Sequence, residues 1–117
     1  MILALLALVE GTVSIGDLVG GAIKATVAAA DRTYTVTTEN IADGQAATIT
    51  WYTDEVKTDT GSAPAGIAIA PEAAVATNAL TLNVTVTETT PTVAGEYFFT
   101  VTVDGIESDV KLLNVAE

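Results

Sequence analysis

The amino-acid sequence predicts an all-β fold in which two antiparallel sheets pack face to face. The composition favours strands, because Val and Thr are abundant in a chain that is 50% hydrophobic and only 5% aromatic. Hydrophobic and polar residues also alternate in several segments, and this period of two is typical of strands with one buried face. The length of 117 residues is sufficient for one domain with seven short strands and their core.

The segment Val93–Val103 alternates most clearly, and we expect it to form the strand around which the core is built. By parity, one face of this strand carries Tyr97, Phe99, Val101 and Val103. The motif Gly95-x-Tyr97-x-Phe99 fits the start of strand F in an immunoglobulin-like sandwich. At that corner a tyrosine hydroxyl bonds back to the chain while its ring packs in the core. The predicted fold is therefore an immunoglobulin-like antiparallel β-sandwich.

The other alternating segments of the chain predict the remaining strands. Turns are expected at Asp43-Gly44, Thr89-Thr90-Pro91 and Asp104-Gly105, where Gly supplies a positive φ or Pro redirects the chain. The strand that ends at Pro71 belongs at a sheet edge, because proline cannot donate to the ladder. Trp51 is expected to fill the centre of the core. The predicted strands are Gly11–Gly16, Gly20–Val27, Arg32–Glu39, Ala46–Thr53, Gly66–Pro71, Ala79–Glu88 and Ser108–Val115.

An apolar partner-binding surface is predicted on the outer face of one sheet. Continued alternation places Trp51, Phe99 and Leu112 toward the core, so that their neighbours face solvent. Strands C, F and G of an immunoglobulin-like sandwich share one sheet, which brings those neighbours together. The alternatives are that they are scattered surface hydrophobes or that the N-terminal arm covers them. The residues expected to anchor a protein partner on this face are Tyr52, Phe98 and Leu113.

Residues 1–10 are predicted to form an apolar N-terminal arm, and residues 11–117 the sandwich domain. The arm is too short for a membrane span, which needs about 20 apolar residues. No Lys or Arg precedes Lys24, so the basic region of a secretion signal is missing. The arm either packs on its own domain as a strand or a helix, or docks on a neighbouring subunit, for example by strand addition. Its expected partner-binding residues are Met1, Ile2, Leu3, Leu5, Leu6, Leu8 and Val9.

The charge balance and the absence of two residue types exclude several functions. With 15 acidic and four basic residues, the net charge of −11 argues against nucleic-acid binding and disfavours anionic membrane surfaces. The chain contains no His and no Cys, which removes Ser-His-Asp and Cys-His catalysis and nearly all zinc sites. It also lacks the glycine-rich loops that bind phosphates. We therefore expect neither an enzyme nor a bound cofactor.

Calcium is the one metal that the sequence leaves open. The loop that contains Asp54, Glu55 and Asp59 offers the oxygen ligands that hard cations prefer. The spacing of these acids differs from the EF-hand signature, and acids in loops are usually solvated. No metal site is therefore predicted, and an ion in the Asp54–Asp59 loop stays an open alternative.

Several segments resemble bacterial and phage immunoglobulin-like surface domains of the Big type. They are Gly11-Thr-Val-Ser-Ile15, Trp51-Tyr52-x-Asp54 and, most densely, Ala94-Gly-Glu-Tyr-Phe-Phe-Thr-Val-Thr-Val-Asp-Gly105. The resemblance supports the sandwich fold and implies a role at a surface, although this fold hosts many unrelated tasks.

Three functions follow as hypotheses. The first is a structural component of a phage virion, a capsid decoration or fibre subunit at the virion surface, in contact with copies of itself or with capsid neighbours. The second is an exported filament or adhesion subunit of a cell surface that polymerises through its apolar N-terminus. The third is a carbohydrate-binding module, which is disfavoured because such modules need exposed aromatic platforms and Trp51 is assigned to the core.

Overall fold

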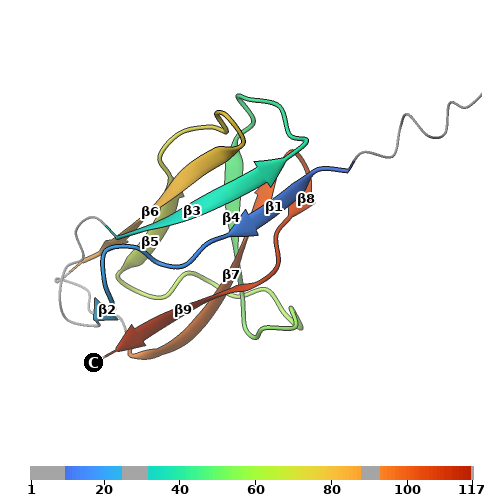
Figure 1. The fold of residues 1–117 in the computed structure, drawn as a ribbon. Coiled ribbons are helices and arrows are strands. Elements are labelled where there is room, and N and C mark those ends of the chain that lie inside the picture. Colours follow the sequence, from blue (N-terminus) through green and yellow to red (C-terminus); the bar gives the residue numbers. More distant parts are fainter. Residues whose placement is uncertain (1–9, 25–31, 88–92, 117) are drawn as a thin grey trace, which may run out of the picture.

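The computed structural model describes residues 10–24, 32–87 and 93–116. These residues form strands without any helix, and the strands pack as two sheets (Figure 1). This confirms the predicted all-β sandwich. The strands are β1 (Thr12–Ile15), β2 (Ile23–Lys24), β3 (Arg32–Glu39), β4 (Ala47–Tyr52), β5 (Ile67–Pro71), β6 (Ala79–Val86), β7 (Gly95–Val103), β8 (Ile106–Glu107) and β9 (Lys111–Ala116).

The order of strands in the two sheets is that of an immunoglobulin-like sandwich. One sheet has the order β1-β3-β6-β5, and the other has β2-β9-β7-β4 with β8 beside β7. If β1, β3, β4, β5, β6, β7 and β9 are lettered A to G, these orders become A-B-E-D and G-F-C. The pairings between these strands are antiparallel, and only the short β2 runs parallel to its neighbour β9.

Alternation places the core side chains where the sequence predicted them on most strands. Tyr34 and Val36 of β3, and Leu80, Leu82, Val84 and Val86 of β6, are buried between the sheets. The edge strand β5 ends at Pro71, as predicted. Residues 1–9 of the predicted arm of residues 1–10, the end of the predicted Gly20–Val27 strand and the Thr89-Thr90-Pro91 turn lie outside the described residues.

The aromatic centre of the core is Phe99 rather than Trp51. Phe99 is fully buried, and its ring centroid lies 5.3 Å from that of Tyr34 and 5.4 Å from that of Trp51. Trp51 faces the core as predicted but is only partly buried, because β4 is the edge strand of its sheet. Tyr97 also packs against the core, and its hydroxyl donates to the carbonyl of Val93, which is the predicted tyrosine corner.

The turn after β7 has the predicted chemistry, but the strand that follows has the opposite parity. Asp104 and Gly105 have φ of 52° and 76°, as a two-residue hairpin turn requires. Near the turn, Thr102 pairs with Glu107; further on, Phe99 pairs with Lys111. Three steps along β7 therefore oppose four steps on the returning chain, so one extra residue forms a β-bulge between β8 and β9.

The bulge overturns the predicted orientation of the last strand. Leu113 and Val115 are 0% and 2% exposed and close the core, whereas Leu112 is 41% exposed on the outer face. The prediction that Leu113 faces outward is wrong because it continued the alternation straight through the hairpin. A shift of one residue moves every side chain of a strand to the other face.

Ser108 holds the bulge in place. Its backbone N–H donates to the carbonyl of Val101 at 2.8 Å, and its Oγ accepts the Val101 N–H at 3.0 Å. The Ser108 hydroxyl donates in turn to the carbonyl of Asp109 at 2.9 Å. The Ser108 side chain is buried and its hydroxyl has hydrogen-bond partners. The extra residue therefore leaves few polar groups of the sheet without a partner.

The bulged register makes a prediction for a matched pair of substitutions. Leu113→Ala should lower the free energy of unfolding by about 3 kcal/mol, because it opens a cavity in the core. Leu112→Ala removes the same atoms from an exposed position and should cost less than about 1 kcal/mol. Urea unfolding followed by the fluorescence of Trp51 measures both. A larger loss from Leu112→Ala than from Leu113→Ala would mean that the strand pairs without the bulge.

Candidate interaction surface

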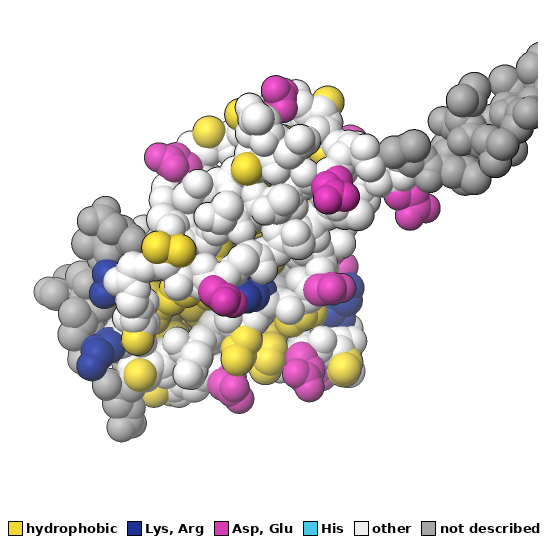
Figure 2. Space-filling view, viewed as in Figure 1, with side chains coloured by type: hydrophobic (Ala, Val, Ile, Leu, Met, Phe, Trp, Pro, Cys, Tyr) yellow, Lys and Arg dark blue, Asp and Glu magenta, His cyan; other side chains and the backbone are white. Residues whose placement is uncertain are grey.

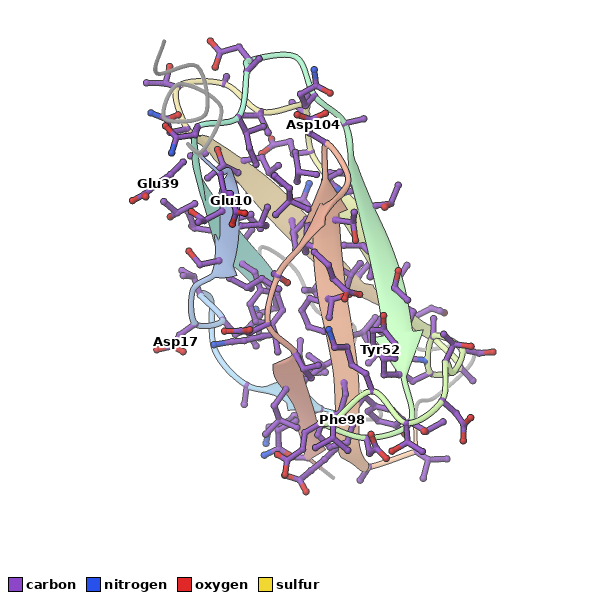
Figure 3. All side chains as sticks on the ribbon, turned by 90° about the vertical axis from the view of Figure 1, so that its right-hand side faces the viewer. Glu10, Asp17, Glu39, Tyr52, Phe98 and Asp104 are labelled. Atoms are coloured by element: carbon purple, nitrogen blue, oxygen red, sulfur yellow. The ribbon has the colours of Figure 1, made fainter. Side chains whose placement is uncertain are left out.

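A row of large apolar side chains crosses the outer face of the sheet that contains β4, β7 and β9. Tyr52 of β4 pairs with Phe98 of β7, which in turn pairs with Leu112 of β9. Residues paired across antiparallel strands point to the same face, so these three side chains lie next to one another in one line. Figure 3 shows Tyr52 and Phe98 side by side on neighbouring strands. Tyr52 and Phe98 are partly exposed, and Leu112 is exposed.

Two of the three residues predicted for this face are there. Tyr52 and Phe98 lie as the sequence indicated, and the bulge puts Leu112 in the place expected for Leu113. The polar run Glu107-Ser108-Asp109 between the hairpin turn and the apolar strand was the signal in the sequence that the alternation is interrupted. The predicted partner-binding residues Met1, Ile2, Leu3, Leu5, Leu6, Leu8 and Val9 lie outside the described residues.

The row borders a groove with an apolar floor and an acidic rim. Its floor is made by Phe98, Leu112 and Val110, and its volume is about 320 Å³. Its rim carries three carboxylates, those of Asp54, Glu55 and Glu96. We call this hollow the outer-sheet groove. Glu96 shares the face of Phe98 because it precedes it by two residues on β7, and Asp54 and Glu55 follow the end of β4 at Tyr52.

A hydrogen-bonded cluster around Glu107 flanks the other side of the row. One carboxylate oxygen of Glu107 accepts the hydroxyls of Tyr52 and Thr100, the latter at 2.8 Å. The other oxygen pairs with the ammonium of Lys57 at 2.8 Å. The hydrogen bonds from Lys57, Tyr52 and Thr100 stabilise the carboxylate and lower the pKa of Glu107 to about 2. The same carboxylate raises the pKa values of Lys57 and Tyr52.

The acids of the 53–60 loop shape the loop itself. One Asp54 oxygen accepts the backbone N–H groups of Val56 at 3.1 Å and Thr58 at 3.0 Å, and the bonds to Thr58 are the largest cause of the lowered pKa of Asp54. The N–H of Thr53 donates to the carbonyl of Asp59 at 3.0 Å. Within residues 10–24, 32–87 and 93–116, no group of three or more acids is arranged to hold a metal ion.

A second hollow, of about 520 Å³, lies where β9 faces the chain between β1 and β2, and three of its polar side chains, Tyr34, Lys111 and Asp17, already have partners. The Tyr34 hydroxyl donates to the carbonyl of Leu112 at 3.5 Å, and burial raises the pKa of Tyr34 to about 12. Lys111 pairs with Asp17 at 2.9 Å. The outer-sheet groove is the better candidate for a binding site, because most of its carboxylate oxygens have no partner among the residues that the structure describes.

Comparison of the chain with known protein families, with characterised proteins and with solved structures finds no match. Among the residues that the structure describes, no helix is long and apolar enough to cross a membrane. Support for the candidate interaction surface therefore comes from the geometry of its own residues.

The Glu107 cluster predicts an acid-dependent contribution to stability. The folded pKa of about 2 lies below the ordinary value of 4.5, so the contribution is complete above pH 4.5 and is lost as the pH falls toward 2. Glu107→Gln should lower the free energy of unfolding by about 1 kcal/mol at pH 7, since the cluster is partly exposed and screened. Urea unfolding at pH 7 and pH 3 should show the variant approaching the wild type in acid.

The control for this prediction is Glu39→Gln. Glu39 is an exposed carboxylate on β3, for which the described residues show no side-chain hydrogen bond. This change should affect stability little at either pH. An effect of Glu107→Gln that is equally large at pH 7 and pH 3 would mean that the cluster contributes through packing and not through the charge of the carboxylate.

Proposed function

We propose that this protein is a non-enzymatic structural subunit of a larger assembly, and that it docks on a neighbouring protein through the outer face of its β4-β7-β9 sheet. The observation that carries the proposal is the row of Tyr52, Phe98 and Leu112 across three paired strands. Aromatic side chains that are grouped on an exposed surface are the usual anchors of protein interfaces. An isolated exposed hydrophobe would need no such explanation.

The chemistry of the chain supports an architectural role. Without His or Cys it lacks the side chain that most often acts as a general base, the thiol nucleophile and the commonest transition-metal ligands. The described acids are solvated, ion-paired or bonded to backbone N–H groups, and Figure 2 shows them spread over the visible face. A stable sandwich with a high negative charge and one apolar face is suited to repeated use on the outside of an assembly.

The assembly that we propose is a phage virion, with the chain as a capsid decoration or fibre subunit. Support comes from the resemblance of the Trp51-Tyr52-x-Asp54 and Ala94–Gly105 segments to bacterial and phage surface domains. The alternative is a cell-surface filament or adhesion subunit that polymerises through its apolar N-terminus. In one form of that alternative a donated strand completes a neighbour's core. Here the position beside β7 is already occupied by β9, whose Leu113 and Val115 fill the core.

Sedimentation of the assembly from the source organism tests the proposal. The wild-type chain should sediment with large particles, and Phe98→Ser should move most of it to the top of a density gradient without unfolding it. Val19→Ser is the matched control, because Val19 is 57% exposed and lies on the bridge to β3 of the opposite sheet. This control should stay with the particles.

Negative-stain imaging of the fast fraction separates the two assemblies. Capsids or virion fibres would support the first, and filaments attached to cells would support the alternative. A wild-type chain that sediments as a free monomer would contradict both. Retention of Phe98→Ser in the particles would remove the outer face as the docking surface.

A further inference from the structure

We infer that the occupant of the outer-sheet groove is a segment of a different protein in which an apolar side chain is flanked by Lys or Arg. This inference rests on the proposed function, since it assumes that the face docks on a protein. It names the chemistry of the partner, which the proposed function leaves open. Two properties of the groove carry it, an apolar floor and an uncompensated acidic rim.

The apolar floor favours the binding of an apolar side chain. Phe98, Val110 and Leu112 present carbon surfaces to a hollow of about 320 Å³, which is at the small end of the range for ligand sites. A polar or charged group placed on that floor would lose its hydration without gaining a hydrogen bond. Phe98 of β7 and Leu112 of β9 are held in place by their pairing in the sheet, and Val110 lies in the bulged segment just before β9.

The acidic rim favours the binding of a positively charged group. Neither Glu55 nor Glu96 makes a side-chain hydrogen bond or an ion pair with any described residue. The lysines of the loop that carries Asp54 and of the start of β9 are already engaged, since Lys57 pairs with Glu107 at 2.8 Å and Lys111 pairs with Asp17 at 2.9 Å. The rim therefore keeps its negative charge beside an apolar surface, where the attraction for a cation is less screened than in open water.

The same charges argue against a second copy of this chain as the occupant. A two-fold symmetric contact through this face would bring the rim acids Asp54, Glu55 and Glu96 of both copies into one small interface. Like charges brought together at an interface repel, and the net charge of −11 adds to the repulsion. A partner that supplies both the apolar anchor and the missing positive charge satisfies the floor and the rim together.

Binding of short labelled peptides to the full-length chain, followed by fluorescence anisotropy, tests the inference. The probe is a peptide in which Leu residues are flanked on both sides by Lys. One comparison peptide has Glu in place of Lys, and another has Ser in place of Leu. We expect only the Lys–Leu peptide to bind. Its affinity should fall as salt rises from about 0.05 M to about 0.5 M, because exposed charges are screened.

Two double variants with the same change of charge locate the binding site. Glu55→Gln with Glu96→Gln removes two of the three rim charges and leaves Asp54, whereas Glu39→Gln with Asp104→Asn neutralises two carboxylates away from Phe98 (Figure 3). Each removes two negative charges from the net charge of −11 and leaves −9. The rim variant should weaken binding of the Lys–Leu peptide about fivefold. The other variant should leave it within about twofold of the wild type, as long-range charge effects are screened.

The floor is tested by Phe98→Ser, which should weaken binding of the Lys–Leu peptide about tenfold while the circular dichroism spectrum stays that of a folded β protein.

Equal weakening by the two double variants would overturn the inference, because the peptide would then respond to overall charge. Equal binding of the Glu–Leu peptide would also overturn it. Dimerisation of the wild type that Phe98→Ser abolishes would assign the face to a second copy of the chain, and the inference would be wrong in that case too.

These outcomes are distinguishable from a failure of the proposed function. If the rim variant binds the Lys–Leu peptide as the wild type does, but Phe98→Ser releases the chain from its particles, then the face docks a protein of other chemistry. In that case the inference fails and the proposed function stands. If Phe98→Ser affects neither peptide binding nor sedimentation, both fail.

Discussion

The register in which β9 pairs with β7 is the constraint on which both sides of this sheet depend. Side chains alternate along a strand, so the pairing of Phe98 with Leu112 sends Leu112 outward and brings Leu113 into the core. Ser108 secures that register by occupying the ladder position opposite Val101 with two hydrogen bonds. A single extra residue thus determines which side chains close the core and which are exposed on the outer face.

Glu107 is the second residue, after Ser108, that fixes the arrangement of the outer face. It lies on the short strand β8, and its carboxylate connects Tyr52 of β4, Thr100 of β7 and Lys57 of the 53–60 loop. The loop is held against the sheet in this way, and with it the rim acids that it carries. The position of the rim relative to the apolar floor therefore depends on a hydrogen-bonded cluster between elements that are far apart in the sequence.

The distribution of charge matters more for recognition than its total. A net charge of −11 keeps the chain soluble and opposes self-association, but it does not select a partner. Selection arises where carboxylates without internal partners border an apolar surface. Because Lys57 and Lys111 are engaged by Glu107 and Asp17, Glu55 and Glu96 of the rim have no ion pair among the described residues. Electrostatic complementarity of this kind favours a correct partner and penalises a similar one.

The sequence by itself determined the class of fold and most of its strands. The alternation in Arg32–Glu39, Ala79–Val86 and Gly95–Val103 is a local property, and burial of one face follows from it directly. The turn at Asp104-Gly105 and the corner at Tyr97 are local too, since they depend on positive φ and on a bond four residues back. The same local alternation predicted that Tyr52 and Phe98 share one outer face.

Only the tertiary structure decided the rest. The bulge between β8 and β9 depends on the hydrogen bonds that Ser108 makes across the sheet. The polar run Glu107-Ser108-Asp109 interrupts the alternation in the sequence, but it does not determine which face of the next strand turns inward. The partial exposure of Trp51 follows from the edge position of β4, which is a property of strand order. The outer-sheet groove joins residues from the 53–60 loop, β7 and the start of β9, and such a juxtaposition exists only once the strands are paired.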